Sequence, residues 1–191
     1  MTSRTEATAA RKEQIVRAAI ALLADRGYQA TTFDAICQTA GLSSKRLITY
    51  HFSGKEDLFA AVADHVVAVA DREMRSELDA AGDPRRLLAA VIRASVTFTA
   101  RHMAEGRALQ EIILGGGDAW EKHHQQSVQR LTRFFADGQR AGAFRDFDPQ
   151  IMATALRAAI DSMYQPLAAG RDPTTCANQL VELFDRATRP R

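Results

Sequence analysis

Cationic, hydroxyl and aromatic side chains follow one another closely within the first third of the chain. They are Ser44, Lys45, Arg46, Thr49 and Tyr50. Lysine and arginine neutralise phosphates and reach guanine edges, while serine and threonine hydroxyls donate to phosphate oxygens or to bases. If these groups share one exposed helix surface, they have the chemistry that contacts a nucleic acid.

Two short helices joined by a glycine turn are expected to position these side chains. Thr32 can cap the first helix. Its apolar face would be formed by Phe33, Ile36 and Ala40. Gly41 would end that helix, because glycine adopts left-handed backbone angles without a Cβ penalty. This succession is typical of a helix-turn-helix.

The second helix is expected to be capped by Ser43, with Leu42 as an apolar contact under the turn. Its spacing places the following residues inward: Leu47, Ile48, His51 and Phe52. The cationic and hydroxyl residues then face outward. In a helix-turn-helix, the first turn of this helix brings its side chains to base edges in the major groove.

Two longer helices are expected to flank the pair. A helix over about residues 8–26 ends at Gly27 and braces the motif from the N-terminal side. On the other side, Ser53 and Glu56 form an S-x-x-E capping box that starts a helix running to about Ala80. Lys55 lies beside the positive end of this helix, where a backbone phosphate could bind.

The ordered residues of this segment resemble a known family. The run G-Y-x-x-T-T-x-x-x-I-x-x-x-A-G-L-S, followed by Y-H-F and K-E-x-L-F, is similar to the N-terminal domain of the tetracycline-repressor (TetR) family of bacterial transcription regulators. The resemblance covers residues 9–60. It implies a three-helix DNA-binding domain in which Ser43 to Thr49 read bases. It also implies phosphate contacts from Thr32, Tyr50, His51 and Lys55.

The sequence leaves some alternatives open. The chain has one residue more than the family's commonest spacing between the glycine turn and Tyr50, so the base-reading register within residues 44–49 is open by about one position. His51 could instead be a packed, hydrogen-bonded histidine, and the Tyr50 ring could pack on the first helix. The motif as a whole could be a helical hairpin with solvated charges.

Composition agrees with a small helical protein. The chain has 191 residues and is 46% hydrophobic, which supports a sizeable core. Residues 1–55 hold eight Lys and Arg against four Asp and Glu, whereas the remainder holds 17 against 19. Cys37 and Cys176 fit neither a zinc site nor a disulfide framework. No apolar run approaches a membrane span, so we expect a soluble, cytoplasmic protein without membrane contact.

Helix starts dominate the rest of the sequence. Three of them are Asp-Pro pairs, at Asp83, Asp148 and Asp172, and a fourth is expected at Asp118. They predict helices near 84–102, 105–114, 118–140, 149–168 and 173–188. Pro166 should kink or end its helix near residues 164–165. Strand patterns are absent. The predicted fold is all-α with about nine helices, divided into a DNA-binding domain (1–56) and a ligand-binding and dimerisation domain (57–191).

The second domain carries residues suited to an apolar pocket with a few polar groups. They are Phe98, His102, Met103, Trp120, His123, His124, Met163 and Tyr164. Ordinary core or surface positions explain each of them equally well, and it is the family resemblance that implies a small-molecule effector. Adjacent histidines diverge on a helix, and no catalytic or phosphate-binding motif is present. We therefore expect no metal, no cofactor and no enzymatic activity.

The two C-terminal helices are expected to associate with a second copy. Small residues in 149–168 allow close helix approach, and 173–188 carries an apolar stripe. The resemblance implies that these helices form a four-helix interface, so that a homodimer presents two recognition helices to a palindromic operator. The predicted function is a ligand-released transcriptional regulator, most often a repressor. The alternatives are a helical small-molecule-binding module that does not bind DNA, and a helical enzyme.

Overall fold

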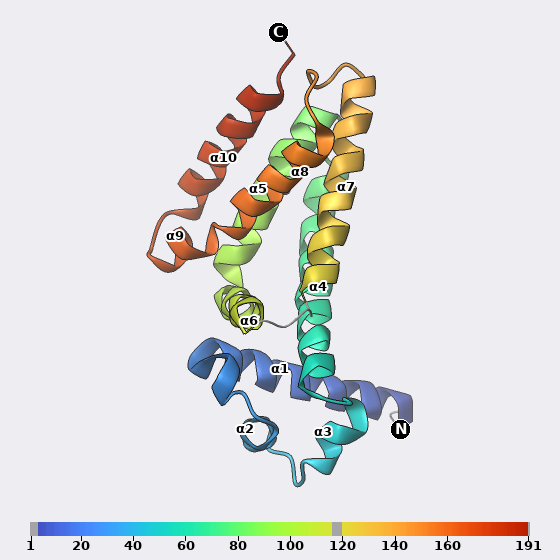
Figure 1. The fold of residues 1–191 in the computed structure, drawn as a ribbon, viewed down its shortest axis with the longest axis vertical. Coiled ribbons are helices and arrows are strands. Elements are labelled where there is room, and N and C mark those ends of the chain that lie inside the picture. The colour runs from blue at the N-terminus through green and yellow to red at the C-terminus, as the bar shows by residue number, and fades with distance from the viewer. Residues whose placement is uncertain (1–3, 116–119, 191) are drawn as a thin grey trace. The chain divides into compact units, whose positions relative to one another are not determined.

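The computed structural model describes residues 4–115 and 120–190, and in these ranges every regular element is a helix (Figure 1). The all-α prediction is confirmed. The helices are α1 (Arg4–Ala30), α2 (Phe33–Thr39), α3 (Arg46–His51), α4 (Lys55–Asp79), α5 (Pro84–Arg101), α6 (Met103–Leu114), α7 (Glu121–Arg140), α8 (Pro149–Asp161), α9 (Tyr164–Ala168) and α10 (Pro173–Thr188).

The chain forms two compact units. Unit 1 comprises Met1–Val67 and Ala104–Lys122, and unit 2 comprises Ala68–Met103 and His123–Arg191. Unit 1 therefore contains α1, α2, α3, the first part of α4, and α6 from Ala104 onward. The predicted boundary between residues 56 and 57 separates a DNA-binding domain from a ligand-binding and dimerisation domain. This division by function stays a prediction.

Unit 1 is held together by apolar side chains from each of its helices. Ile15 and Leu23 of α1, Ile36 of α2, Ile48 of α3 and Phe59 of α4 have no exposed surface. Full burial of such a side chain contributes about 1.5–3 kcal/mol. Even α3, with only six residues, is thus anchored by its apolar face.

Helix α1 is longer than predicted and contains a break. It begins at Arg4, and Gly27 interrupts the helical backbone with φ 78° and ψ 179°. The prediction that the regular helix stops at Gly27 is therefore confirmed, although one further turn follows to Ala30. The buried Thr31 donates its hydroxyl to the Gly27 carbonyl at 2.8 Å. This bond fixes the break beside the start of α2.

The turn between α2 and α3 has the predicted glycine geometry. Thr32 caps α2 by accepting from the Ala35 amide at 3.2 Å. Gly41 has φ 62°, and the amides of Gly41 and Leu42 donate to the carbonyls of Gln38 (3.1 Å) and Cys37 (2.9 Å). These two bonds form a Schellman motif, which satisfies the last carbonyls of α2.

Two predicted caps were wrong. Ser43 does not cap α3: the helix begins at Arg46 after the N-cap residue Lys45, which makes no side-chain cap, and the Ser44 hydroxyl accepts from the Arg46 amide at 3.2 Å. At the start of α4, the partner of Ser53 is Asp57 rather than Glu56. The Asp57 carboxylate accepts from the Ser53 amide at 2.8 Å and from its hydroxyl at 3.1 Å. Because α4 begins only at Lys55, Asp57 is the residue in reach.

Unit 2 has its own core, formed by α5, α7, α8 and α10. Phe135 lies at its centre, with Phe144 and Phe147 rings each 5.5 Å from it. The Asp-Pro starts are confirmed: the carboxylates of Asp83, Asp148 and Asp172 accept from amides of the following first turns. The expected start at Asp118 lies outside the described residues.

The predicted helix over 149–168 forms two helices. Helix α8 ends at Asp161 and α9 begins at Tyr164, so the interruption lies at Ser162 and Met163. Proline lacks an amide hydrogen, and its ring clashes with the carbonyl four residues earlier, here that of Ser162. The kink attributed to Pro166 is thus present, but it lies at Ser162 and Met163, two residues before the predicted position at 164–165.

Candidate nucleic-acid interface

The outward surface of the α3 segment carries the predicted donors. Ser44, Lys45, Arg46 and Thr49 are exposed, and the Tyr50 ring is 74% exposed. On the opposite side, Ile48 is fully buried and Phe52 nearly so. The exposure of Tyr50 disfavours the alternative in which its ring packs on α1. The buried Ile48 and Phe52 therefore fix the orientation of the exposed face that carries Ser44, Lys45, Arg46, Thr49 and Tyr50, which we call the donor face.

One of these donors already has a partner on α2. The Lys45 Nζ lies 2.9 Å and 3.1 Å from the two carboxylate oxygens of Asp34. Both side chains are more than half exposed. The sequence alone did not mark Asp34, an acidic residue in the first turn of α2, as the partner of Lys45.

His51 lies at the end of α3 and is half-buried. Its ring contacts the Tyr50 ring edge-on, with 5.1 Å between centroids. Burial lowers the pKa of His51, and the cations Lys12 and Arg11 lower it further. The packed-histidine alternative and the phosphate contact are both compatible with this position, so the role of His51 stays a prediction.

Operator binding is expected to strengthen as the pH falls from about 8 to about 6. A phosphate beside His51 would raise its lowered pKa, because an anion favours the imidazolium form. Binding would then take up a proton, and proton uptake makes affinity increase at lower pH. Titrating the dissociation constant against pH for the native chain and for His51→Gln checks this. Equal slopes in the two proteins would remove His51 from the phosphate contacts.

Lys55 is engaged within unit 1. Its Nζ donates to the Tyr28 carbonyl at 2.7 Å and lies 4.0 Å from the centroid of the Tyr28 ring. Burial lowers the pKa of Lys55. The Tyr28 hydroxyl in turn donates to Glu56 at 3.1 Å. Lys55 therefore joins the start of α4 to the end of α1, and its predicted phosphate contact is not tested by this arrangement.

Helix α6 also contacts the chain at Tyr28. Beyond the break at Gly27, the Tyr28 amide donates to the Glu111 carboxylate at 3.1 Å, and Arg107 pairs with Glu111 at 2.7 Å. Gly115 lies so close that a Cβ there would be 2.3 Å from the Tyr28 ring. Nothing in the sequence indicated these contacts, because Tyr28 and Glu111 are 83 positions apart.

Gly115→Ala is expected to weaken operator binding by displacing the Tyr28 ring from Lys55. An added Cβ at 2.3 Å cannot be accommodated without movement, and overpacking of this kind costs about 1–3 kcal/mol. Urea unfolding and operator titration measure the two effects. Gly54→Ala is the matched control, because a Cβ at Gly54 meets nothing within 4 Å. If Gly115→Ala and Gly54→Ala had the same stability and the same operator affinity, the contact of the Tyr28 ring with Lys55 would not support operator binding.

The predicted ligand residues are spread over several helices. Phe98 of α5 stacks on His102, with 4.4 Å between ring centroids, and the His102 Nε2 lies 3.0 Å from both carboxylate oxygens of Glu73. His124 lies 3.7 Å from Asp161. The remaining positions are half-buried: Met103, Trp120, His123, Met163 and Tyr164. Trp120 belongs to unit 1 and the other seven belong to unit 2. Their ligand contacts stay a prediction.

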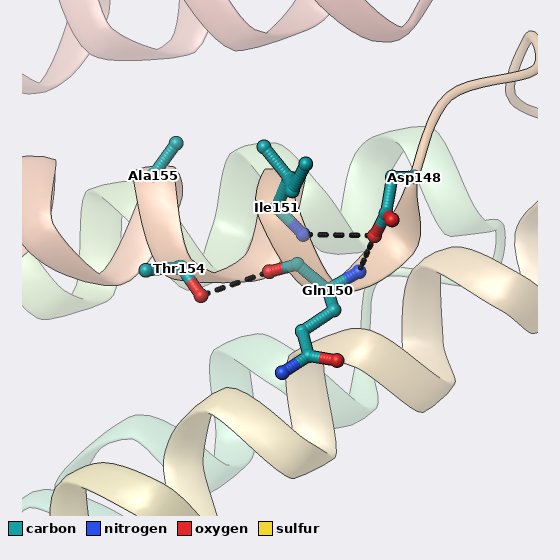
Figure 2. Close-up of a pocket in the computed structure, with 5 residues that line it drawn as sticks. All are labelled: Asp148, Gln150, Ile151, Thr154 and Ala155. Atoms are coloured by element: carbon teal, nitrogen blue, oxygen red, sulfur yellow. Dashed lines mark hydrogen bonds between the residues drawn. The ribbon is translucent and has the colours of Figure 1, made fainter.

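A shallow pocket lies at the start of α8, among residues that we expected to associate with a second copy. It is lined by Asp148, Gln150, Ile151, Thr154 and Ala155. Figure 2 shows Ile151 and Ala155 projecting from the same side of α8, while the Asp148 carboxylate caps the helix. Ile151 is 70% exposed, and Leu183 of α10 is 58% exposed. Unit 2 therefore presents apolar side chains that its own core does not cover.

The described residues contain no helix long and apolar enough to span a membrane. In the same ranges, no group of three or more His, Cys, Asp and Glu side chains is arranged to hold a metal ion.

Comparisons with known proteins agree with the geometry. The sequence model of "Bacterial regulatory proteins, tetR family" matches residues 15–62, which include α2 and α3. The HTH-type transcriptional regulator BetI of Brucella canis is 28% identical over 187 residues, covering 92% of this chain and 88% of BetI.

Two solved structures share the fold. A transcriptional regulator from Saccharomonospora viridis in complex with choline has a TM-score of 0.79 at 22% identity, covering 96% of this chain and 100% of its own. FadR from Bacillus subtilis in complex with stearoyl-CoA has a TM-score of 0.78 at 19% identity, covering 90% and 96%. Residues 15–62, which contain the helix-turn-helix, match the tetR family of bacterial regulatory proteins, and the chain as a whole is similar to the transcriptional regulator BetI over nearly its full length.

Proposed function

We propose that the chain is a homodimeric, cytoplasmic repressor that binds a palindromic operator through α3 and leaves it when a small molecule occupies unit 2. The match of residues 15–62 to the tetR family and the similarity to BetI support a DNA-binding transcriptional regulator. The observation that carries the proposal is the exposed donor face of Ser44 to Tyr50, fixed on a buried scaffold by Ile48 and Phe52. In the helix-turn-helix arrangement such a face enters the major groove.

Phosphate contacts are proposed on either side of this face. Thr32, Tyr50, His51 and Lys55 are the candidates, and the basic balance of residues 1–55 supports a negatively charged partner. The Tyr50 side chain is 74% exposed. Lys55 can contribute only if its amine keeps the Tyr28 carbonyl while a second hydrogen points outward, since an ammonium group has three donors.

Dimerisation is proposed through α8 and α10. Ile151 and Leu183 are exposed apolar side chains on these two helices, and small residues beside them allow a close approach. A two-fold dimer would place two copies of α3 on successive major grooves, about 34–36 Å apart. Ligand binding then needs only to favour a dimer geometry in which this spacing is lost. Helix α4 begins in unit 1 and ends in unit 2, so it is the proposed route of that coupling.

The effector is proposed to be a small molecule held by apolar and aromatic residues of the predicted ligand set. Choline and stearoyl-CoA, found in the two similar structures, differ greatly in size and polarity. Both are therefore used as probes in a first titration of the complex with operator DNA, because fold similarity does not indicate which of them resembles the effector. Release of operator DNA by either probe would define the effector class.

Salt dependence of duplex binding tests the proposed function. A protein that neutralises about six phosphates should lose about a thousandfold in affinity between 50 and 200 mM salt. A helical ligand-binding module that does not use DNA would show no duplex binding at either salt concentration, and that outcome would overturn the proposal.

A further inference from the structure

The ion pair between Lys45 and Asp34 lies where α2 and α3 meet on the exposed surface. The Lys45 Nζ is 2.9 Å from one Asp34 oxygen and 3.1 Å from the other. The Lys45 side chain is 56% exposed and the Asp34 side chain is 68% exposed. A hydrogen-bond donor and an acceptor are thus held side by side, open to solvent, next to the donor face of α3.

Neither stability nor general DNA attraction explains Asp34. An exposed ion pair adds little to stability, because water already solvates both charges. On a surface that binds phosphates, a carboxylate repels the backbone and partly neutralises Lys45. A surface selected only for phosphate attraction would be better without Asp34, so its pairing with Lys45 calls for a role that uses the negative charge.

The edge of a G·C base pair in the major groove supplies a matching partner. Guanine presents the acceptors N7 and O6, and cytosine presents the N4 amino donor next to O6. In the base pair these neighbouring groups are about 2.9 Å apart, the usual hydrogen-bond distance. The Lys45 amine can bridge N7 and O6 while the Asp34 carboxylate accepts from N4. The amine and the carboxylate then match the acceptors and the donor of the base pair in order and in spacing.

An A·T pair is a poorer partner for the same two side chains. Its edge runs from acceptor N7 to donor N6 and then to acceptor O4. With the carboxylate on N6, the amine can reach N7 or O4 but not both. One polar group of the base pair is left without its partner, and an unmade hydrogen bond in a closed interface is costly.

We propose that Lys45 and Asp34 act together as a reader of one G·C base pair in each operator half-site. This inference rests on the proposed function, because it requires the α3 surface to bind duplex DNA. It adds a residue of α2 to the base-reading surface, which the sequence placed wholly within residues 43–49.

The test compares base preferences of the native chain with those of Asp34→Ala and Lys45→Ala. A duplex selected by the native protein from genomic fragments is varied one base pair at a time, and affinities are measured at fixed salt. Both variants are expected to lose discrimination against A·T at the same single position of each half-site, by about fivefold to 150-fold. Asp34→Ala should also bind random duplex more tightly, because a repelling charge is gone.

Asp25→Ala is the matched charge control. Asp25 is an exposed carboxylate of α1, paired with Arg26 at 3.2 Å. Its removal changes the net charge equally and should leave every base preference intact. Modified bases give a second control at the G·C position. Inosine keeps the major-groove edge of guanine and should bind as well as guanine, whereas N4-methylcytosine covers the amino donor and should weaken native binding but not Asp34→Ala.

The possible outcomes separate the inference from the function. If the native chain binds no duplex, the proposed function fails and the inference fails with it. If Lys45→Ala weakens all sequences equally and Asp34→Ala changes no preference, Lys45 is a phosphate contact and only the inference is overturned. Loss of discrimination at two different positions would also overturn it, because the residues would then not act as a pair.

Discussion

Replacing Lys45 and Arg46 together with alanine is expected to reduce operator affinity at least about 30-fold and up to about ten-thousandfold. Each good contact to a base edge is worth about 1–3 kcal/mol, and every 1.4 kcal/mol changes the affinity tenfold. Both side chains are exposed, and the anchors of α3, Ile48 and Phe52, are unchanged. Thermal unfolding and the oligomeric state should therefore stay as in the native chain.

A charge-matched variant in unit 2 provides the control. Arg130 and Arg133 of α7 are exposed, and replacing both with alanine removes the same charge from a surface with no proposed DNA contact. Operator affinity should then remain close to that of the native chain. Footprints of the Lys45 and Arg46 double variant that match the native pattern would remove α3 from the recognition surface.

Introducing arginine at both Ile151 and Leu183 is expected to convert the proposed dimer to monomers and to lower operator affinity by about a hundredfold to ten-thousandfold. An arginine in a closed interface must lose its hydration without a partner, which is costly. A monomer holds one half-site at a time, so the gain from simultaneous binding of two half-sites is lost. Because both positions are exposed in the single chain, folding should survive the change.

Sedimentation velocity measures the oligomeric state, and an operator titration measures the affinity. Leu114→Arg is the matched control, because Leu114 is an equally apolar side chain, 78% exposed on α6, outside the proposed interface. It should leave the dimer intact. A native chain that sediments as a monomer at micromolar concentration, or a double variant that stays dimeric, would contradict the interface.

Local signals predicted most of the fold, because helix caps and turns depend on neighbouring residues. Thr32 and Asp83 cap the expected helices, and Gly41 makes the expected turn. The same signals gave the wrong capping residue at Ser43, since serines stand at two successive positions and either hydroxyl could accept. Which serine hydroxyl bonds to the helix depends on where α3 begins, and it begins at Arg46.

Long-range contacts explain what could not be predicted. The bond from the Tyr28 amide to Glu111 and the packing of Gly115 on the Tyr28 ring depend on how α6 lies in unit 1. The pair formed by Lys45 and Asp34 likewise depends on the angle between α2 and α3. Residue types at single positions carry no information on these distances. For that reason the sequence marked Lys45 as a donor but did not mark its partner.

The ligand residues were harder to predict for a different reason. An apolar pocket and an ordinary core use the same residue types at the same helical spacing, as Met103 and Met163 illustrate by packing on the core of unit 2. Polar groups such as His102 distinguish a pocket only when their partners are known, and Glu73 lies on a different helix. Effector contacts therefore need a bound molecule to define them.

We propose that a dimer reads a palindrome through two copies of α3. The most direct test is a footprint of the purified native chain on the genomic fragment that it selects, measured at low and at moderate salt. We expect two protected half-sites related by two-fold symmetry, with centres about 34–36 Å apart or a multiple of that distance, and protection that weakens steeply with salt. Failure to enrich any fragment over random DNA, or a single unsymmetrical protected site, would contradict it.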